Sequence, residues 1–174
     1  MAFLVLAFPT LDRKDLDWIQ SHRKTNDNLF YKIVDPHFTL VFPVYDKTET
    51  EFIKEVTARS KGIKKINFEL RSAAGNKDEL SEYYHEFLVP EKGYSDIVKL
   101  HDQLYSGELL SNLNSEIDFI PHITIGTSNE EHKCNVNVGK LNSENISIGG
   151  TIEQLTVVKY ENNVVTKIIE VALG

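Results

Sequence analysis

Two short segments of this chain have nearly the same sequence. Pro36-His37-Phe38-Thr39-Leu40 is matched in the second half by Pro121-His122-Ile123-Thr124-Ile125. Successive side chains of an extended strand point to opposite faces, so the histidine and threonine of each segment share one face and the two apolar residues share the other. Each segment therefore predicts a strand with a buried apolar face and a His-Thr pair on its open face.

A single histidine on a strand carries little information about function, because most are partly buried or surface residues with a satisfied hydrogen bond. With ordinary residue usage, a histidine preceded by proline and followed by apolar, Ser/Thr and apolar residues is expected about once per thousand histidines. The chain has 6 histidines. Two such copies therefore indicate one site that contains His37 and His122, with Thr39 and Thr124 beside them.

The apolar pattern predicts the same order of elements twice: strand, helix, His-Thr strand, helix, strand. In the first half, the expected strands are residues 3–8, 29–44 and 63–70, and the expected helices are 12–24 and the segment after the capping-box sequence Thr48-Glu49-Thr50-Glu51. In the second half, we expect strands at 86–89 and 117–126, a helix from Ser95, and a hairpin of 151–159 with 164–173. The polar, Asn-rich stretch 129–147 predicts a loop with one short helix at most.

These elements predict a single two-lobed domain over residues 1–174 of the α+β class. The chain has 174 residues and 41% hydrophobic content, enough for one compact domain. Two units related by a pseudo-twofold axis would each contribute a mainly antiparallel sheet, with helices on the outside. The two His-Thr faces would then meet in a central cleft, where one imidazole on each side suits a reaction that needs a general base and a general acid.

Charge and composition limit the ligands and the cellular locations that suit this chain. The net charge of −7 argues against a broad nucleic-acid surface, whereas a small phosphate ligand needs only local donors. The basic cluster of Arg59, Lys61, Lys64 and Lys65 is interpreted as a solvated face rather than an RNA groove. No apolar run is long enough to span a membrane, and Cys134 is interpreted as an incidental thiol. We expect a cytoplasmic monomer with no membrane contact.

The paired motif, its spacing and the duplicated order of elements resemble the 2H phosphoesterase superfamily, which includes 2′-5′ RNA ligase-like proteins and RNA 2′,3′-cyclic phosphodiesterases. The resemblance covers essentially the whole chain. It implies that His37 and His122 are the catalytic pair and that Thr39 and Thr124 bind phosphate oxygens. It implies no metal and no cofactor. The implied partner is a small nucleotide or an RNA 3′-end that carries a cyclic phosphate.

The residues are consistent with that chemistry. A neutral histidine can take the proton of an attacking water while a protonated one delivers a proton to the leaving ribose oxygen, and threonine hydroxyls can donate to the non-bridging oxygens. One neutral and one charged imidazole predict a bell-shaped pH profile. We take His122 as the acid and His37 as the base, an assignment that the sequence does not fix. Family members commonly leave a 2′-phosphate.

Weaker candidates for substrate contact follow from a departure from the family pattern. Bacterial relatives often carry a basic residue shortly after the second motif, where this chain continues Gly126-Thr127-Ser128. Thr127 and Lys159 are therefore candidates to meet the phosphate charge, although a solvated lysine is the alternative interpretation of Lys159. Phe42 and Tyr84, with Tyr83, are candidates to stack on a base, although core packing is the alternative role for each. His85 is a candidate third histidine of the cleft, whereas His22, His101 and His132 are interpreted as structural or surface residues.

Other functions fit the same residues. The two histidines could act on 2′-5′ linked oligonucleotides, by cleavage or ligation, and substrate length would distinguish this activity. A nucleotide- or RNA-binding protein without turnover would keep the same cleft. A metal site is the fourth option, but the two histidines supply only half of a tetrahedral shell, and no Asp, Glu or Cys stands at ligand spacing from either.

Overall fold

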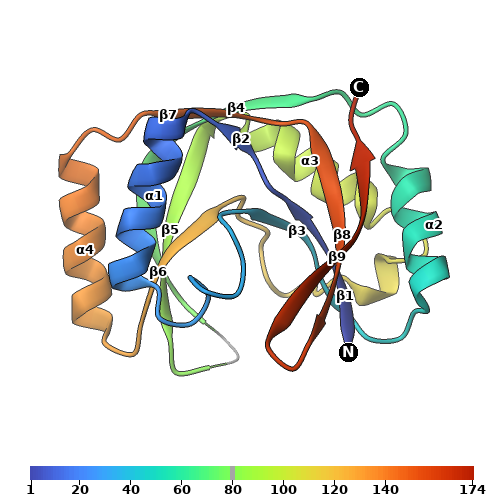
Figure 1. The fold of residues 1–174 in the computed structure, drawn as a ribbon, viewed down its shortest axis with the longest axis horizontal. Coiled ribbons are helices and arrows are strands. Elements are labelled where there is room, and N and C mark those ends of the chain that lie inside the picture. The colour runs from blue at the N-terminus through green and yellow to red at the C-terminus, as the bar shows by residue number, and fades with distance from the viewer. Residues whose placement is uncertain (79–80) are drawn as a thin grey trace.

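The computed structural model describes residues 1–78 and 81–174 (Figure 1). The strands are β1 (Ala2–Ala7), β2 (Thr10–Leu11), β3 (Phe38–Val44), β4 (Ile66–Lys77), β5 (Tyr84–Lys92), β6 (Ile123–Ser128), β7 (Ile148–Ile152), β8 (Gln154–Glu161) and β9 (Val164–Ala172). The helices are α1 (Arg13–Asn26), α2 (Glu49–Arg59), α3 (Tyr94–Leu104) and α4 (Glu131–Ser143), with a short 3-10 helix at Leu110–Asn112.

The strands form two antiparallel sheets, which confirms the expected α+β fold. One sheet has the order β3-β1-β8-β9 and the other has the order β2-β7-β4-β5-β6. The sheets differ from the expectation because each sheet takes strands from both halves of the chain. β4 pairs with β5 and β8 pairs with β1. Strands that follow one another along the chain tend to pair, so β4 joins β5, its successor, rather than β1.

Helices α1, α2 and α4 lie on the outer sides of the sheets, whereas α3 packs against β3 of one sheet and against β4 and β5 of the other. Figure 1 shows α1 and α4 beside the sheet that contains β5 and β6, and α2 at the far side of the other sheet. α1 packs against β6, and α4 packs against β4, β5 and β6, while α2 packs against β1 and α3. The inner faces of both sheets are therefore left to line the space between them.

A capping box starts α2, as the sequence predicted. The Glu51 backbone N–H donates to the Thr48 hydroxyl at 3.4 Å, and the Glu51 carboxylate accepts from the Thr48 backbone N–H at 2.9 Å. This reciprocal pair satisfies two of the donors that a helix N-terminus leaves open. The helix begins at Glu49 for that reason.

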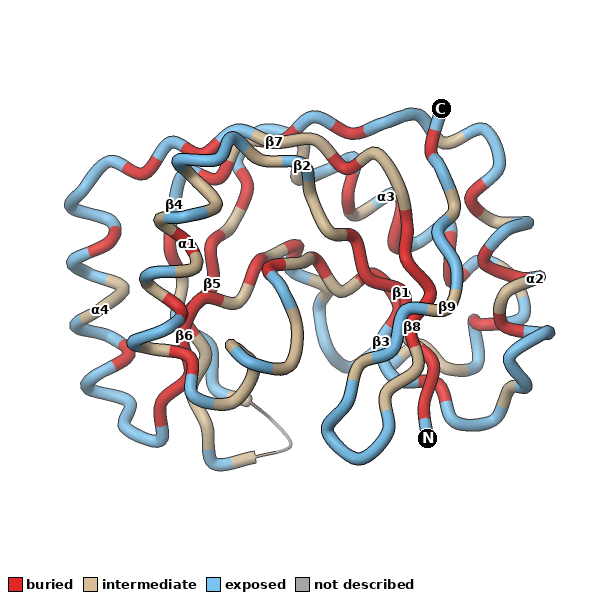
Figure 2. The backbone as a smooth tube through the Cα atoms, viewed as in Figure 1, coloured by how far each residue is buried: buried red, intermediate tan, exposed pale blue. Residues whose placement is uncertain are grey.

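The core follows the strands of both sheets. Figure 2 shows β1 and β6 mostly as buried residues, while the outer turns of α2 and α4 are exposed. Phe38 and Leu40 of the first motif and Ile123 and Ile125 of the second are all fully buried, at 0% exposure. The apolar face of each motif is thus part of the core, and the motif is held by packing on one side.

The expectation of a loop at residues 129–147 was wrong, because α4 occupies Glu131–Ser143. Its buried stripe is narrow: Cys134 and Leu141 are buried, and Val138 packs partly against the core. These three positions have the spacing of one helix face, but the surrounding asparagines hide the pattern. Cys134 is correspondingly a buried thiol that donates to the His85 carbonyl at 3.6 Å, and burial raises its pKa.

The two motif strands begin later than expected. The segment 29–37 forms turns and irregular backbone before β3 starts at Phe38, and residues 117–122 precede β6, which starts at Ile123. In both cases a proline stands two residues before the strand and cannot donate a ladder hydrogen bond. Within residues 1–78 and 81–174, no helix is long and apolar enough to cross a membrane.

Candidate active site

Both motif segments present their polar residues in the same way. His37 and Thr39 are partly exposed, whereas the apolar residues between and after them are buried. His122 and Thr124 repeat this pattern residue for residue. Each histidine directly precedes its strand, and each threonine lies inside it. Strand alternation therefore places an imidazole and a hydroxyl together on one face of each sheet.

The two imidazoles also make the same hydrogen bond. His37 Nδ1 lies 2.8 Å from the Asp35 carbonyl oxygen, and His122 Nδ1 lies 2.6 Å from the Ile120 carbonyl oxygen. Each partner is two residues earlier, across the proline. Because a carbonyl can only accept, we infer that Nδ1 carries the hydrogen in both rings. Nε2 is then the nitrogen that gains or loses a proton.

One cleft of about 840 Å³ is lined by all four motif residues. His37 and Thr39 line it from the first sheet, together with Leu4 and Leu6 of β1. His122 and Thr124 line it from the second sheet. The structure therefore brings both predicted His-Thr pairs to the same cleft.

Burial sets the charge of the two histidines. Desolvation lowers the pKa of His37 to about 4, although the bond to the Asp35 carbonyl acts in the opposite direction. Desolvation likewise lowers the pKa of His122 to about 4, with further lowering from His37 and His85. The ordinary value is 6.5. Both rings are therefore neutral near pH 7 while the cleft holds no anion.

These lowered pKa values predict that the protein loses stability in mild acid. Below the ordinary pKa of 6.5, the unfolded chain takes up protons at both histidines, whereas the folded chain does so only near pH 4. The free energy of unfolding therefore falls as the pH falls through this window. Between about pH 7 and about pH 4.5, we expect native protein to lose about 2 kcal/mol more than the His37→Gln variant, as measured by urea unfolding.

The His132→Gln variant is the control for this measurement, because His132 is an exposed residue of α4. It should show the same pH dependence as the native protein, because the His132 side chain is in contact with solvent in the folded chain as it is in the unfolded chain. An identical pH dependence in the native and His37→Gln proteins would show that His37 is not held neutral by the fold.

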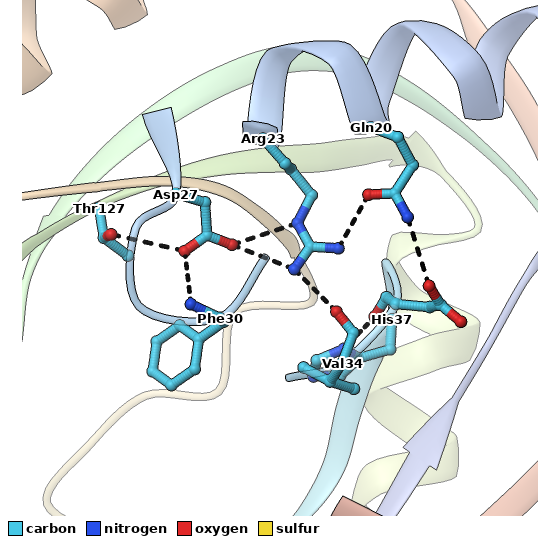
Figure 3. Close-up of polar contacts among 8 residues, drawn as sticks. Gln20, Arg23, Asp27, Phe30, Val34, His37 and Thr127 are labelled. Carbon is cyan, nitrogen blue, oxygen red and sulfur yellow. Dashed lines mark hydrogen bonds and ion pairs between the residues drawn. The ribbon is translucent and has the colours of Figure 1, made fainter. Parts of the chain in front are cut away.

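A buried ion pair supports the segment that carries His37 (Figure 3). Arg23 of α1 donates to the Asp27 carboxylate at 3.1 Å, and their side chains are 2% and 0% exposed. The same guanidinium donates to the Val34 carbonyl at 2.9 Å, and Asp27 accepts from the Phe30 backbone N–H at 3.0 Å. The irregular segment between α1 and β3 is therefore fixed at two points, and His37 is its last residue.

Aromatic packing fixes the second histidine. The His122 ring is stacked on the Phe87 ring of β5, with ring centroids 3.6 Å apart and an angle of 19° between the planes. The His85 ring is also parallel to the Phe87 ring, with the two centroids 6.0 Å apart. His85 lines the cleft as well, where its Nε2 is 3.5 Å from an Asp78 carboxylate oxygen. His122 thus has little freedom to rotate.

Sequence reasoning missed Phe87, Arg23 and Asp27 as parts of the site. The alternation of β5 carried a signal for Phe87, because it stands two residues after His85 and so shares its face. Arg23 and Asp27 had the spacing of a helical ion pair, but that pattern is usual on solvated helices and did not indicate burial. His101, interpreted as structural or surface, is buried and also lines the cleft.

The weaker candidates for substrate contact differ in their position relative to the cleft. Phe42 lines the cleft. Tyr84, Thr127 and Lys159 are not among the described residues that line it. Thr127 is buried, and its hydroxyl donates to Asp27 at 3.4 Å. Lys159 pairs across the sheet with the core residue Phe3, while its neighbours in β8 turn to the cleft. Neither Thr127 nor Lys159 therefore lines the cleft.

Within residues 1–78 and 81–174, no group of three or more His, Cys, Asp or Glu side chains is arranged to hold a metal ion.

Comparison with known sequences finds relatives over almost the whole chain. The model of the 2′-5′ RNA ligase superfamily matches residues 10–164. A provisionally named phosphoesterase of Geobacillus sp. (strain WCH70) is 27% identical over 157 residues, which cover 88% of this chain and 85% of that protein. Another, of Halalkalibacterium halodurans, is 24% identical over 94% of this chain and 91% of that protein.

Solved structures share the fold. TT0787 of Thermus thermophilus superposes with a TM-score of 0.65 at 15% identity, covering 99% of this chain and 98% of that one. Kluyveromyces marxianus Usb1 has a TM-score of 0.59 at 10% identity, with coverage of 99% and 98%. E. coli LigT in its apo form has a TM-score of 0.57 at 16% identity, with coverage of 99% and 96%.

Proposed function

The chain belongs to the 2′-5′ RNA ligase superfamily, the 2H phosphoesterases, and on this basis we propose that it is a metal-independent phosphodiesterase that opens 2′,3′-cyclic phosphates at RNA ends or on nucleotides. His37 and His122 are the proposed acid/base pair. Thr39 and Thr124 are the proposed phosphate ligands. Membership of the family alone gives neither the cyclic substrate nor the roles of these four residues.

The matched orientation of the two histidines is the observation that carries this proposal. Both rings bind a carbonyl through Nδ1, at 2.8 Å and 2.6 Å, and both line the same cleft. Two imidazoles with the same tautomer can each handle a proton at Nε2. A reaction that adds a proton on one side of a phosphorus atom and removes one on the other side needs such a pair.

The charge state of the cleft fits an anionic substrate. Both histidines are neutral in the unliganded site because burial lowers each pKa to about 4. A phosphate anion between them raises their pKa values, because an opposite charge nearby favours the protonated imidazole. Substrate binding would thereby load one ring with the proton that the leaving group needs. The other ring stays neutral and serves as the base.

The proposed reaction is a hydrolysis in which water opens the cyclic phosphodiester. The water oxygen forms a bond to phosphorus, and its proton passes to Nε2 of the neutral histidine. The bond between phosphorus and one ribose oxygen breaks, and that oxygen receives the proton of the charged histidine. The hydroxyls of Thr39 and Thr124 can donate to the non-bridging oxygens, where negative charge is held in the transition state. The product is a nucleoside monophosphate.

Relatives with bound nucleotides support the substrate class. E. coli LigT has been solved with 3′-AMP, and Kluyveromyces marxianus Usb1 with uridine monophosphate. In this chain, Phe42 lies at the cleft with 46% of its surface exposed, so its ring is available to contact a base. Base–aromatic stacking tolerates every base, because each has a π-face.

The test is hydrolysis of the four nucleoside 2′,3′-cyclic phosphates in the presence of EDTA. We expect turnover that EDTA leaves unchanged, with a 2′-phosphate as the product isomer. The isomer is identified by chromatography against 2′- and 3′-nucleotide standards. Turnover that EDTA abolishes would contradict the metal-independent mechanism. Binding without turnover of any of the four would exclude the proposed activity and would favour 2′-5′ linked oligonucleotides or a binding role.

A further inference from the structure

We propose that this cleft selects a single nucleoside 2′,3′-cyclic phosphate over the end of an RNA chain. The inference rests on the proposed function and narrows its substrate to a compact diester with one phosphate and one aromatic group. Two features of the cleft carry it: its lining offers almost no positive charge, and its mouth is apolar.

Charge is the first feature. Arg23 is the only lysine or arginine among the described residues that line the cleft, and its side chain is 2% exposed. Its guanidinium is already bonded to Asp27, to the Val34 carbonyl and to the Gln20 side chain. Asp78 and Asp118 also line the cleft. A chain with several phosphates gains its affinity from Lys and Arg contacts, which this lining does not supply.

Two lysines beside the cleft make other contacts. Lys167 lies over the Phe8 ring at 4.4 Å, and Phe8 neighbours His37 with ring centroids 5.9 Å apart. Lys77 binds the Ser81 carbonyl and lies over the Tyr84 ring. Neither lysine lines the cleft, so neither adds positive charge to its lining.

The basic cluster found in the sequence belongs to a different hollow. Lys61, Lys64 and Lys65 line a groove of about 430 Å³ together with Lys99 of α3, and this groove shares no lining residue with the cleft. Lys65 is paired with Glu153 and Lys99 with Asp96. These lysines therefore do not extend the cleft into a binding path for RNA.

The apolar mouth is the second feature. Phe42, Ile117 and Ile120 line the cleft and remain 46%, 42% and 40% exposed. Clustered exposed apolar side chains in a soluble protein mark a site that a ligand or partner covers. A nucleobase would cover them and remove them from water, whereas a phosphodiester backbone passing through the mouth would desolvate its charges against apolar groups.

The mouth is held in place by the residues beneath it. The Phe42 backbone N–H donates to the Tyr105 hydroxyl at 3.0 Å. On the other rim, Phe119 stacks on His101 with centroids 3.8 Å apart and an angle of 7°. Both rims are thus anchored to α3 or its end. These contacts show that the apolar opening is held in place by the fold around it.

The test compares two substrates that share the same reacting group. One is a nucleoside 2′,3′-cyclic phosphate, and the other is an oligoribonucleotide of about six nucleotides that ends in the same cyclic nucleotide. We expect kcat/KM to be at least about 10-fold higher for the mononucleotide. We also expect that raising the salt concentration affects both substrates equally, because the cleft engages none of the additional phosphates.

A lysine introduced at the mouth of the cleft gives a second test of the substrate preference. The Ile117→Lys variant should shift the kcat/KM ratio toward the oligonucleotide by about 5-fold or more, because the lysine can meet a second phosphate. Leu110→Lys is the matched control: Leu110 is also apolar and exposed, at 60%, but it does not line the cleft. It should leave the ratio unchanged. An equal shift in both variants would show that net charge, not the cleft mouth, sets the preference, and would overturn the inference.

The outcomes separate this inference from the proposed function. If the oligonucleotide is hydrolysed as well as the mononucleotide, the inference fails and the proposed function stands. If neither is hydrolysed, the proposed function fails, and calorimetric titration with the 2′-nucleotide and with an oligonucleotide ending in a 2′-phosphate decides the inference. Tighter binding of the mononucleotide would support the selectivity of the cleft, and equal or tighter binding of the oligonucleotide would overturn it.

Discussion

Replacing either His37 or His122 with glutamine is expected to lower kcat for nucleoside 2′,3′-cyclic phosphates by a factor on the order of 10² to 10⁴. Glutamine is close to histidine in size and keeps an N–H that can reach the backbone carbonyl now bound by Nδ1. It has no group that gains or loses a proton near pH 7. The substitution therefore removes proton transfer from the site and leaves most of its shape.

The double variant gives the stronger result. Both protons move in one turnover, so removal of the second histidine should lower kcat little once the first has been removed. The double variant should therefore be about as active as the less active of the two single variants. The His132→Gln variant, which changes an exposed histidine of α4, should retain native activity. Independent, multiplicative losses at His37 and His122 would contradict a concerted acid/base pair.

Much of the fold could be predicted because the chain repeats itself. The two motifs located β3 and β6, and apolar alternation located the buried strands around them. The pairing of the strands was less accessible, because β4 pairs with β5 of the other half, and an internal repeat does not say which half its third strand joins. Helix α4 was missed because only Cys134, Val138 and Leu141 mark its inner face.

The four motif residues of the candidate site were accessible for a simple physical reason. Strand alternation fixes which side chains share a face, and the apolar partners fix which face is buried. The same rule explains why Lys159 does not line the cleft. Val158 and Tyr160 line the cleft, so Lys159 between them faces away from it. Thr127 pairs with His85, which lines the cleft, but the Thr127 side chain is buried and its hydroxyl donates to Asp27.

The missing basic residue after the second motif also has a structural cause. Gly126 lies opposite Glu86, and a Cβ at this position would lie 2.5 Å from a Glu86 carboxylate oxygen. Glu86 is itself buried and accepts from Asn137 at 2.8 Å. A side chain cannot be added at Gly126 without moving this carboxylate. Gly126 therefore belongs to the packing around the buried Glu86 carboxylate.

The buried Arg23–Asp27 pair leads to the second large expected effect, because the Asp27→Ala variant should lose about 3 to 5 kcal/mol of the free energy of unfolding. The substitution leaves the Arg23 guanidinium without its carboxylate at a position where the side chain is 2% exposed. It also removes the acceptor of the Phe30 backbone N–H. Urea unfolding at pH 7 measures the loss directly.

The same helix contains a matched control for this prediction. Arg13 and Asp17 form an ion pair with the same spacing in α1 and the same 3.1 Å separation, but their side chains are 87% and 63% exposed. Water and salt screen such a pair, so Asp17→Ala should change the free energy of unfolding by about 0.5 kcal/mol or less. The two variants remove the same chemical group from an ion pair of the same spacing and differ chiefly in burial. Equal losses would show that the buried pair contributes no more than a surface pair.

A double substitution separates the charge from the contact. The Arg23→Met/Asp27→Ala variant carries no buried charge, so it should recover part of the stability that Asp27→Ala loses. Its activity should stay below that of the native protein, because the substitution removes the bond from Arg23 to the Val34 carbonyl in the segment that carries His37. Stability regained without turnover would mean that the pair positions His37 in addition to filling the core. Recovery of both would assign it to packing alone.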